Sequence, residues 1–427
     1  MKLHARKSTL TGTIPIPGSK SHTIRGVALA SLADGVSTLR HPLISGDTMS
    51  AVACYRALGA EIDTHDPTEW VVTGTAGRIA PPDGVINVGN SGTTLRIAAG
   101  SAALSDGSRS VELTGDYQIQ RRPLHPLLQS LSDLGARAVS VKGNGMAPIS
   151  IQGTLTGGET EIECMTSQYL SSLLLACPLA KNDTYINVSL LNEPDYVQMT
   201  LDWLDKQGIL YDNDRFRRIR VQGGQRYNPF DLPVPADFSS ATFFLCAGAM
   251  LRADITLTGL DFSDSQPDKA VADYLERMGA EIRVDNHTVR IRRSSLQGID
   301  IDMNRTPDAL PAMAVVGALA EGTTRLLNVP QARKKETDRI ACMATELGKL
   351  GVDTEELTDG LIIHHCPRLK SAALSGYDDH RIVMALSLAL MAIEDGGSID
   401  TAEAINVTFP EYITLMQKLG ARMKLSE

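Results

Sequence analysis

One glycine-terminated pattern recurs six times along the chain. Apolar residues at helical spacing lead to a glycine and a further apolar residue, as in AVACYRALGA (51–60) and VADYLERMGA (271–280). Glycine is favoured directly after a helix because the left-handed conformation required there is strained for residues with a Cβ atom. The glycines follow one another at intervals of about 70 residues: Gly59, Gly135, Gly208, Gly279, Gly351 and Gly420. This spacing predicts six copies of one structural unit.

A second class of helix recurs at the same interval. Each begins with a small polar or acidic residue and continues through small apolar residues, with starts near Ser21, Ser91, Ser167, Ser239, Asp308 and Asp379. Short alternating segments, such as AEIRV (280–284) and TVRIR (288–292), indicate strand pairs. We therefore predict an α/β (α+β) fold with two domains, each of three βαβαββ units related by pseudo-threefold symmetry.

Two proline-rich segments separate the units into two groups of three. IPIPGS (14–19) precedes the first unit and LPVPAD (232–237) precedes the fourth. Pro-x-Pro extends the backbone and interrupts strand pairing. The last unit lacks one strand, which residues 2–5 could supply. We predict an N-terminal-half domain at 14–234, a C-terminal-half domain made of 1–13 and 235–427, and a two-strand hinge.

Composition argues against several other classes of protein. The net charge of −9 disfavours a general nucleic-acid-binding surface, although a local basic pocket remains compatible with it. The six cysteines show no CxxC spacing and lie mostly in apolar runs, which predicts buried, reduced thiols. No apolar run reaches membrane-spanning length, and the first residues lack the apolar region of a signal peptide. We expect a cytoplasmic monomer without nucleic-acid or membrane partners.

Basic residues at the predicted helix starts carry the main functional signal. Lys20 lies within GSKS (18–21) and Arg25 follows it, both in the first turns of a predicted helix. Positive charge there opposes the helix dipole unless an anion binds. Arg96 follows a Gly-Thr-Thr sequence, and Arg121 and Arg122 open another predicted helix, suited to bidentate contacts with carboxylate or phosphate. Each motif alone is also compatible with an ordinary helix cap or a solvated basic turn.

The C-terminal half mixes acids and bases at equivalent places in the repeat. KKETDR (334–339) and DDHR (378–381) each open a predicted helix, and Asp308 is expected to cap another. We expect these groups to converge with the cations of the first half, an arrangement suited to anionic substrates and acid–base chemistry. His22 and His380 lack partners at metal-ligand spacing, so polar contacts at helix starts are favoured over a metal site.

Together these motifs resemble the 5-enolpyruvylshikimate-3-phosphate synthase (3-phosphoshikimate 1-carboxyvinyltransferase) family. The matching residues are collinear over essentially the whole chain: Gly18-Ser19-Lys20-Ser21, Asn90-x-Gly92-Thr93-x-x-Arg96, Arg122-Pro123, Ser167-Gln168, Pro307-Asp308, Lys335-Glu336-Thr337-Asp338-Arg339 and Asp379-His380-Arg381. The resemblance implies transfer of the enolpyruvyl group of phosphoenolpyruvate to the 5-hydroxyl of shikimate 3-phosphate, through a tetrahedral intermediate and with release of phosphate. It places the reaction in chorismate and aromatic amino-acid biosynthesis and implies no metal or cofactor.

The resemblance also implies roles for individual residues. Asp308 would orient or deprotonate the attacking hydroxyl, and Glu336 would protonate the methylene carbon. The implied catalytic residues are Lys20, Asp308, Lys335 and Glu336. The implied phosphoenolpyruvate-binding residues are Lys20, Gly92, Arg122, Gln168, Arg339 and Arg381. The implied shikimate 3-phosphate-binding residues are Lys20, Ser21, Arg25, Thr166, Ser167, Gln168, Tyr196, Asp308, Gln331 and Lys335.

Three positions depart from the family pattern. Val407 stands where many relatives have a lysine before Thr-Phe-Pro. Asn192 stands near the place of a serine that holds the shikimate phosphate, and Gln331 near that of an asparagine. These changes bear on substrate affinity more than on the type of reaction. Gly92 leads us to expect that the pocket admits glyphosate, as in sensitive relatives.

Three other functions remain to be weighed. The sister enolpyruvyl transferase that acts on UDP-N-acetylglucosamine typically has a reactive cysteine before its Arg-Pro, and residues 115–118 contain none. A ring-like DNA clamp built from repeats would need basic residues along a helix face rather than at helix starts. A phosphate-binding protein without turnover would not need Asp308 and Glu336 together.

Overall fold

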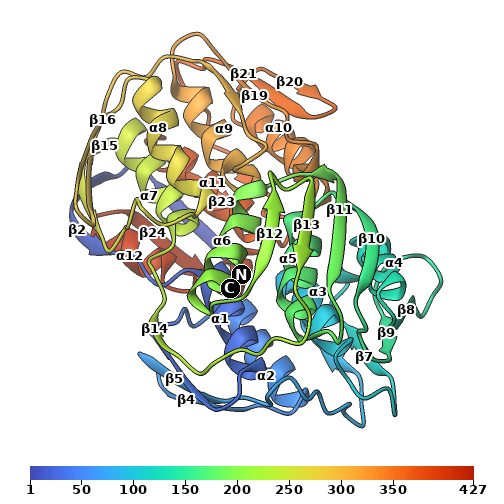
Figure 1. Cartoon of the computed structure of the whole chain (residues 1–427). Helices are drawn as coiled ribbons and strands as arrows, with labels where there is room; N and C mark the ends of the chain where they lie inside the picture. Colours follow the sequence, from blue (N-terminus) through green and yellow to red (C-terminus); the bar gives the residue numbers. More distant parts are fainter. The chain divides into compact units, whose positions relative to one another are not determined.

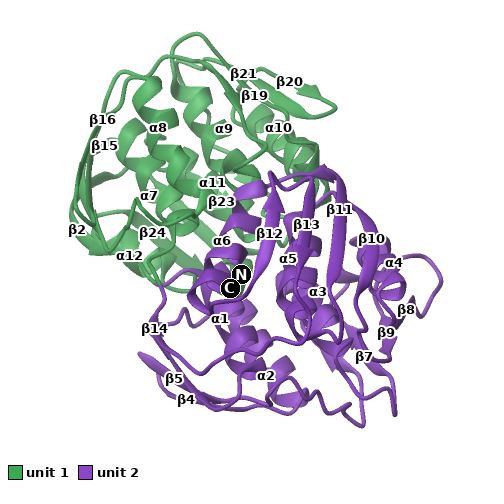
Figure 2. Ribbon diagram, in the orientation of Figure 1, with its two compact units in different colours: residues 1–17, 235–427 green, residues 18–234 purple.

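Six four-stranded sheets of one topology make up the fold (Figure 1). In each sheet, one strand pairs in parallel with its neighbour and the other two continue antiparallel, as in the order β18-β19-β21-β20. The computed structural model describes residues 1–427 and divides into unit 1 (residues 1–17 and 235–427) and unit 2 (residues 18–234; Figure 2). Each unit has its own buried apolar core, and the mixed α/β fold class predicted from the repeat is confirmed.

Unit 2 contains three consecutive repeats. The first has α1 (Lys20–Leu32), β3 (Val36–Arg40), α2 (Gly46–Ala57), β4 (Glu61–Asp66) and β5 (Glu69–Thr73). The second has β6 (Ile86–Asn87), α3 (Gly92–Ala102), β7 (Val111–Thr114), α4 (His125–Asp133), β8 (Arg137–Ser140) and β9 (Ile149–Gln152). The third has β10 (Gly158–Cys164), α5 (Ser167–Ala176), β11 (Thr184–Leu191), α6 (Pro194–Lys206), β12 (Tyr211–Asp214) and β13 (Arg218–Val221).

Unit 1 repeats the same order. Its first repeat has α7 (Phe238–Met250), β15 (Arg252–Thr258), α8 (Ala270–Arg277), β16 (Glu281–Asp285) and β17 (Thr288–Arg292). The second has β18 (Asp300–Asp302), α9 (Leu310–Leu319), β19 (Thr323–Leu327), α10 (Arg339–Lys349), β20 (Thr354–Leu357) and β21 (Gly360–His364). The third has β22 (Ala373–Leu374), α11 (His380–Leu390), β23 (Gly397–Ile399), α12 (Tyr412–Lys418) and β24 (Arg422–Ser426). Short 3-10 turns join these elements: η1 (Ile119–Arg121), η2 (Cys177–Leu179), η3 (Pro267–Lys269), η4 (Pro307–Ala309), η5 (Pro330–Lys334) and η6 (Ala402–Val407).

Strands distant in sequence complete three of the sheets. β2 (Thr9–Pro15) pairs in parallel with β15 in unit 1, and β14 (Asp231–Pro233) pairs in parallel with β3 in unit 2. The sequence places the first domain boundary at residues 13 and 14. The structure places it after Pro17, because β2 continues through Pro15 and its pairing holds that segment in unit 1.

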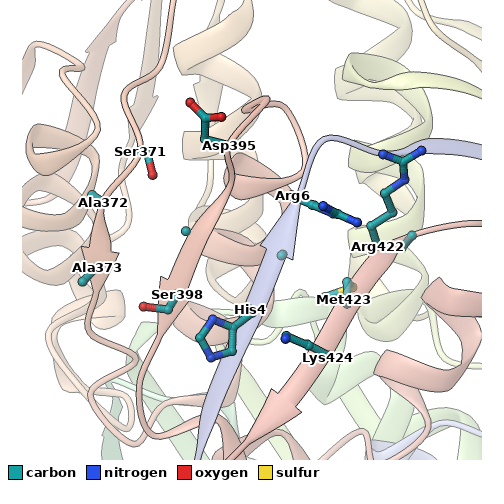
Figure 3. A pocket seen from close by; sticks show the side chains of 13 residues that line it. His4, Arg6, Ser371, Ala372, Ala373, Asp395, Ser398, Arg422, Met423 and Lys424 are labelled. Carbon is teal, nitrogen blue, oxygen red and sulfur yellow. The ribbon is translucent and has the colours of Figure 1, made fainter.

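The N-terminal strand fills the gap predicted in the last repeat. β1 (Lys2–Arg6) lies between β23 and β24 and pairs antiparallel with both. In this register His4 is opposite Lys424, and Arg6 is opposite Arg422 (Figure 3). The two ends of the chain therefore meet in one sheet of unit 1.

The six repeat glycines occupy the predicted conformation. Their φ angles lie between +66° and +108°, in the region that favours glycine. Each follows the second helix of its repeat, from α2 to α12. The glycine spacing therefore marked the same turn in all six repeats.

The first helices of the repeats form the centre of each unit. In unit 1, α7, α9 and α11 contact one another and are almost entirely buried. Small residues also let the central helices lie close to the sheets. A Cβ atom on Gly248 of α7 would overlap the side chain of Ile291 on β17. In unit 2, α3 contacts both α1 and α5. The first turns of these buried helices carry most of the residues that the resemblance singles out.

The cysteines form no disulfides, in agreement with the sequence. Five of the six are buried and Cys342 is partly exposed. Burial raises the pKa of the Cys54 and Cys177 thiols to about 12. Separately, none of the helices combines the length and the apolar character needed to cross a membrane.

Candidate active site

A buried arginine connects three carboxylates in unit 1. Arg339, at the first position of α10, is 1% exposed. Its Nη1 donates to Asp308 Oδ1 at 2.7 Å, and its Nη2 donates to Glu336 Oε2 at 2.5 Å. Its Nε donates to Asp379 Oδ2 at 2.8 Å. One guanidinium thus fixes two predicted catalytic carboxylates and a third acid behind them.

Two further cations lie beside Asp308. Arg381 Nη2 is 3.2 Å from Asp308 Oδ2 and donates to the Ser239 hydroxyl at 2.7 Å. Lys335 Nζ is 3.8 Å from Asp308 Oδ1. Asp308 remains 18% exposed at its side chain, so it is both surrounded by cations and accessible. The structure therefore brings the predicted residues Asp308, Lys335 and Arg381 together with Glu336 and Arg339.

Burial and charge act in opposite directions in this cluster. Burial alone would lower the pKa of Arg339, but Asp379, Glu336 and Asp308 raise it well above the ordinary value. Burial would raise the pKa of Asp379, and Arg339 reverses this effect so that the carboxyl titrates below its usual range. Burial lowers the pKa of the adjacent His380 to about 3. Arg339 and Asp379 are therefore a charged pair beside a neutral imidazole.

The local backbone differs from the sequence prediction at two places. Asp308 does not cap a helix; it lies in the turn η4 and its side chain instead binds Arg339 and Arg381. Lys335 and Glu336 lie before α10 rather than in its first turn, since Asp338 is the N-cap. Asp308 and Lys335 instead make charge contacts with residues distant in sequence, and Glu336 pairs with Arg339 three residues later. Local capping rules do not include them.

Two residues that depart from the family pattern, Gln331 and Val407, lie in the turns η5 and η6. Gln331, in η5, donates from Nε2 to the carbonyl of Asn304 at 2.9 Å. Its Oε1 is buried without a hydrogen-bond partner. Val407 is partly buried at the end of η6. The structure does not bring Gln331 into the set formed around Asp308.

In unit 2, the first helix presents Lys20 at its N-terminus. Ser19 caps α1 by accepting from the backbone N–H of His22. Lys20 Nζ lies 3.1 Å from Asp47 Oδ2 in the first turn of α2. The His22 ring faces inward, where its Nδ1 accepts from Trp203 at 3.0 Å. The capping and the ion pair hold Lys20 at the exposed end of an otherwise buried helix.

Arg25 is a buried cation held by neutral groups. Its guanidinium donates to the carbonyl of Ser21 at 3.0 Å, the hydroxyl of Ser171 at 3.2 Å and the carbonyl of Tyr196 at 3.0 Å. Its Nε also donates to Thr200 at 2.9 Å. Burial lowers its pKa to about 10. A buried guanidinium whose hydrogen-bond partners are all neutral favours the binding of an anion nearby.

The start of α3 forms a second cationic region. Arg96 Nη1 donates to Gln168 Oε1 at 2.9 Å, and Gln168 Nε2 donates to Thr93 Oγ1 at 3.0 Å. A Cβ atom on Gly92 would lie 2.6 Å from Arg122 Nη1 and 2.7 Å from Arg96 Nη1. Glycine at position 92 therefore leaves space for two guanidiniums. Arg122 itself lies in an extended segment, because α4 begins at His125 and not at Arg121 as predicted.

Sequence reasoning missed the role of Glu193. Its side chain is 2% exposed, and its Oε2 accepts from the Ser167 hydroxyl at 2.8 Å, the Ser167 N–H at 3.3 Å and the Thr166 hydroxyl at 3.4 Å. Glu193 is the N-cap of α6 in a left-handed conformation, with φ of 59°. The available signal was an acidic residue directly before the proline that opens a helix. Asn192 instead donates to the carbonyl of Met165 at 3.2 Å.

The cluster around Arg339 in unit 1 and the cationic helix starts of unit 2 are suited to anion binding and proton transfer. Lysine and arginine side chains with backbone N–H groups at helix starts bind phosphate and carboxylate. Two carboxylates fixed by one arginine can exchange protons with a bound substrate. No group of three or more His, Cys, Asp or Glu side chains is arranged to hold a metal ion.

The chain matches the family model of EPSP synthase (3-phosphoshikimate 1-carboxyvinyltransferase) over residues 5–416. A 3-phosphoshikimate 1-carboxyvinyltransferase of Acetivibrio thermocellus is 52% identical over 427 residues, covering 100% of both chains. One of Ruminiclostridium cellulolyticum is 49% identical, again with 100% of both chains covered.

Solved structures show the same architecture. An EPSP synthase from Acinetobacter baumannii superposes with a TM-score of 0.84 at 25% identity and 100% coverage of both chains. The enolpyruvyl transferase NikO from Streptomyces tendae shares the fold with a TM-score of 0.80 at 18% identity, over 99% of this chain and 98% of that one. The full-length sequence match and the site residues lead to one conclusion: this chain belongs to the EPSP synthase family of transferases.

Proposed function

We propose that the protein transfers the enolpyruvyl group of phosphoenolpyruvate to the 5-hydroxyl of shikimate 3-phosphate, releasing phosphate. Family membership supports the reaction. Within the site, the proposal depends most on Arg339, which holds Asp308 at 2.7 Å and Glu336 at 2.5 Å. This contact places two carboxylates for proton transfer beside one cation.

The reaction proceeds by addition and elimination. The acceptor oxygen bonds to C2 of phosphoenolpyruvate while a proton is added to C3, giving a tetrahedral ketal phosphate. Loss of a proton from the same methyl carbon and cleavage of the C–O bond to phosphate then restore the double bond. Each step needs a proton donor or acceptor near carbon and stabilisation of phosphate oxygens.

Unit 1 supplies the proton-transfer groups in this proposal. Glu336 donates the proton to C3 and takes one back in the elimination step. Asp308 orients the acceptor hydroxyl and accepts its proton, with Lys335 nearby to stabilise the developing charge. Arg339 and Arg381 bind the phosphoenolpyruvate anion, and Arg339 keeps both carboxylates in place. The contacts of both arginines with Asp308 support this assignment.

Unit 2 supplies anion-binding groups. Lys20, Arg122 and Gln168 are assigned to phosphoenolpyruvate, with Gly92 leaving space beside the two guanidiniums. The acceptor is assigned to the helix starts at Ser21 and at Thr166–Gln168, and to Arg25 and Tyr196. The bonds from Arg25 to the carbonyls of Ser21 and Tyr196 support a shared surface for these residues. Gln331 has the weakest support, because its amide binds Asn304.

A phosphate-release assay with two acceptors tests the proposal. We expect phosphate release from phosphoenolpyruvate only when shikimate 3-phosphate is present. Equal release with UDP-N-acetylglucosamine would instead favour the sister reaction. Failure of a folded sample to release phosphate with either acceptor would contradict enolpyruvyl transfer.

A pair of variants tests the assignment of Glu336. Glu336→Gln should lower kcat about 10² to 10⁴-fold with little change in KM, since general acid–base groups contribute that much. Glu403→Gln removes a carboxylate that binds the N-terminal amine at 2.7 Å and should leave turnover unchanged. A Glu336→Gln enzyme with normal kcat would assign proton donation to another group. A cytoplasmic location and a monomeric state stay predictions from the sequence.

A further inference from the structure

Unit 1 contains a cavity of about 650 Å³ that the proposed reaction does not use. It lies at the C-terminal ends of α7, α9 and α11, the helices whose N-terminal ends carry Ser239, Asp308 and Arg381. One such helix spans about 15 Å at 1.5 Å per residue, so the cavity is remote from Asp308. Its size is within the range of small-molecule sites, about 300–1,000 Å³.

The lining combines an apolar floor with a basic rim. Met250, Leu251 and Leu296 lie at the bottom of the cavity with 9%, 4% and 5% exposure, and they present a small apolar surface. The basic lining residues are Lys7, Arg252, Arg293 and His365. Glu321 also lines the cavity, and its carboxylate accepts a hydrogen bond from the Gln297 amide at 3.0 Å. Positive charge around a pocket with apolar surface fits a ligand that is both apolar and anionic.

The basic residues follow the threefold repeat of unit 1. Lys7, Arg293 and His365 each stand directly after the equivalent strand, namely β1, β17 and β21. The next residue in each case donates its backbone N–H to a carbonyl at the end of the adjacent central helix: Ser8 to Met391 at 3.1 Å, Ser294 to Ala249 at 3.0 Å, and Cys366 to Ala318 at 2.8 Å. The helix ends are therefore satisfied by backbone groups at all three positions.

Unit 2 shows that the fold does not require these charges. The residues directly after the corresponding strands β5, β9 and β13 are Gly74, Gly153 and Gln222. Thr75 donates its backbone N–H to the carbonyl of Ser31 at 2.8 Å, so a central helix ends in the same way there. Basic side chains can stabilise helix C-termini, but none of the three residues that follow the corresponding strands in unit 2 is basic. The basic residues of unit 1 therefore need another explanation.

Arg252 and Arg293 differ from two neighbouring arginines in having no carboxylate partner. Arg290 and Arg292 on β17 both bind Asp254, at 2.8 and 3.1 Å. Arg252 and Arg293 line the cavity without an ion pair. Lys7 is partly neutralised by Glu394 at 2.5 Å, and His365 Nδ1 lies 3.0 Å from the carbonyl of Ala320. The charge available for a ligand is thus concentrated on Arg252 and Arg293.

We propose that this cavity binds a small organic acid with an apolar body. Its carboxylate accepts hydrogen bonds from Arg252 and Arg293, and its apolar part covers Met250, Leu251 and Leu296. A bidentate guanidinium contact matches the planar geometry of a carboxylate. The site is separate from the groups assigned to enolpyruvyl transfer and does not depend on that assignment.

Titration calorimetry with 2-naphthoate tests the site in the full-length protein. We expect saturable binding of one equivalent, weakened about tenfold by Arg293→Gln because a hydrogen bond to a charged group is lost. The neutral 2-naphthylmethanol should bind at least tenfold more weakly. Arg422→Gln is the matched control: it removes the same charge from the exposed sheet face beside Arg6 (Figure 3) and should leave binding unchanged.

Three results would overturn the proposal. Absence of saturable 2-naphthoate binding would contradict the site. Equal affinity of the native and Arg293→Gln proteins would show that Arg293 does not bind the carboxylate. Loss of 2-naphthoate binding on adding saturating shikimate 3-phosphate would place the probe at the anion-binding helix starts instead. Thermal unfolding of each variant distinguishes weakened binding from a damaged fold. A second variant, Arg252→Gln, should weaken binding to a similar extent.

Discussion

The Glu193 carboxylate accepts a hydrogen bond of 2.8 Å from the Ser167 hydroxyl at the start of α5. The Ser167 N–H and the Thr166 hydroxyl are directed to the same oxygen. These are the donors that the family resemblance assigns to the acceptor. In this structure the protein's own carboxylate thus occupies anion-binding groups. An acceptor phosphate that used these donors would compete with Glu193.

Replacing this carboxylate should improve acceptor binding. We expect Glu193→Gln to lower the KM for shikimate 3-phosphate about fivefold, since a neutral amide is a weaker acceptor and does not repel phosphate. The KM for phosphoenolpyruvate and kcat should change little. Initial-rate kinetics with each substrate varied will measure this. A raised KM for shikimate 3-phosphate would show that Glu193 supports the acceptor site.

Arg339 should be important for both stability and activity. Arg339→Gln leaves the buried Asp379 and the partly buried Asp308 and Glu336 without their shared cation. Removing one partner of a buried charge network costs about 3–5 kcal/mol of unfolding free energy, and kcat should fall at least about 10²-fold.

An exposed arginine provides the comparison for Arg339. Arg325 pairs with Asp300 at 3.1 Å, with both side chains roughly half exposed. Arg325→Gln should cost less than about 1 kcal/mol and leave turnover intact. Chemical unfolding and phosphate-release kinetics on both variants will compare them. Similar losses in the two would contradict the importance given to the buried network.

His380 should make the fold sensitive to acid. Burial lowers its pKa to about 3 from an ordinary value of 6.5. Between these values the unfolded chain binds a proton that the folded chain does not, so the unfolding free energy falls as the pH is lowered. The difference between the native protein and His380→Asn should change by at most about 1.4 kcal/mol per pH unit.

Denaturant unfolding between pH 6.5 and 4.5 measures this dependence. Asp379, Glu336, Arg339 and Arg381 also surround the imidazole, which is why only the difference between the two proteins is diagnostic. His65 is 97% exposed at its side chain, and His65→Asn should leave the slope unaltered. Parallel curves for the native and His380→Asn proteins would mean that His380 is not held neutral.

Gly92 should control the space around the two guanidiniums. In Gly92→Ala, the new Cβ atom would lie 2.6 Å from Arg122 Nη1 and 2.7 Å from Arg96 Nη1, so both side chains must shift. We expect the KM for phosphoenolpyruvate to rise about tenfold, a cost of about 1.4 kcal/mol. Competition by glyphosate should weaken with it.

A second glycine in unit 2 serves as the control for Gly92. A Cβ atom on Gly84 would have no neighbour within 4 Å. Gly84→Ala should therefore leave the kinetics unchanged. Unaltered phosphoenolpyruvate kinetics in the Gly92→Ala enzyme would remove Gly92 from the binding site.

The fold was largely predictable because its signals are local and repeated. Gly59 and its five counterparts each mark the end of a second helix, and a positive φ strongly restricts the residue type. The boundary at Pro17 was harder to predict. Pairing of β2 with β15 joins residues more than 200 positions apart, and such pairing leaves no local pattern in the sequence.

The site was predictable in its residues more than in its geometry. Asp308, Glu336 and Arg339 were all selected from motifs, but the contact between Arg339 and Asp308 follows from tertiary packing. Arg122 was expected at a helix start and lies in an extended segment. Glu193 was missed because its carboxylate meets Ser167 only when β10 and β11 bring their following helices together. The site roles themselves stay predictions.

The position of β1 has a consequence for biosynthesis. β1 leaves the ribosome before all of unit 2, yet its sheet partners β23 and β24 are made after unit 2. Unit 2 is continuous from residue 18 to 234 and can fold while the rest is still being translated, since domains generally fold as units. Residues 2–6 therefore lack these partners until β23 and β24 have been made, and an early misplaced contact of β1 would delay only unit 1.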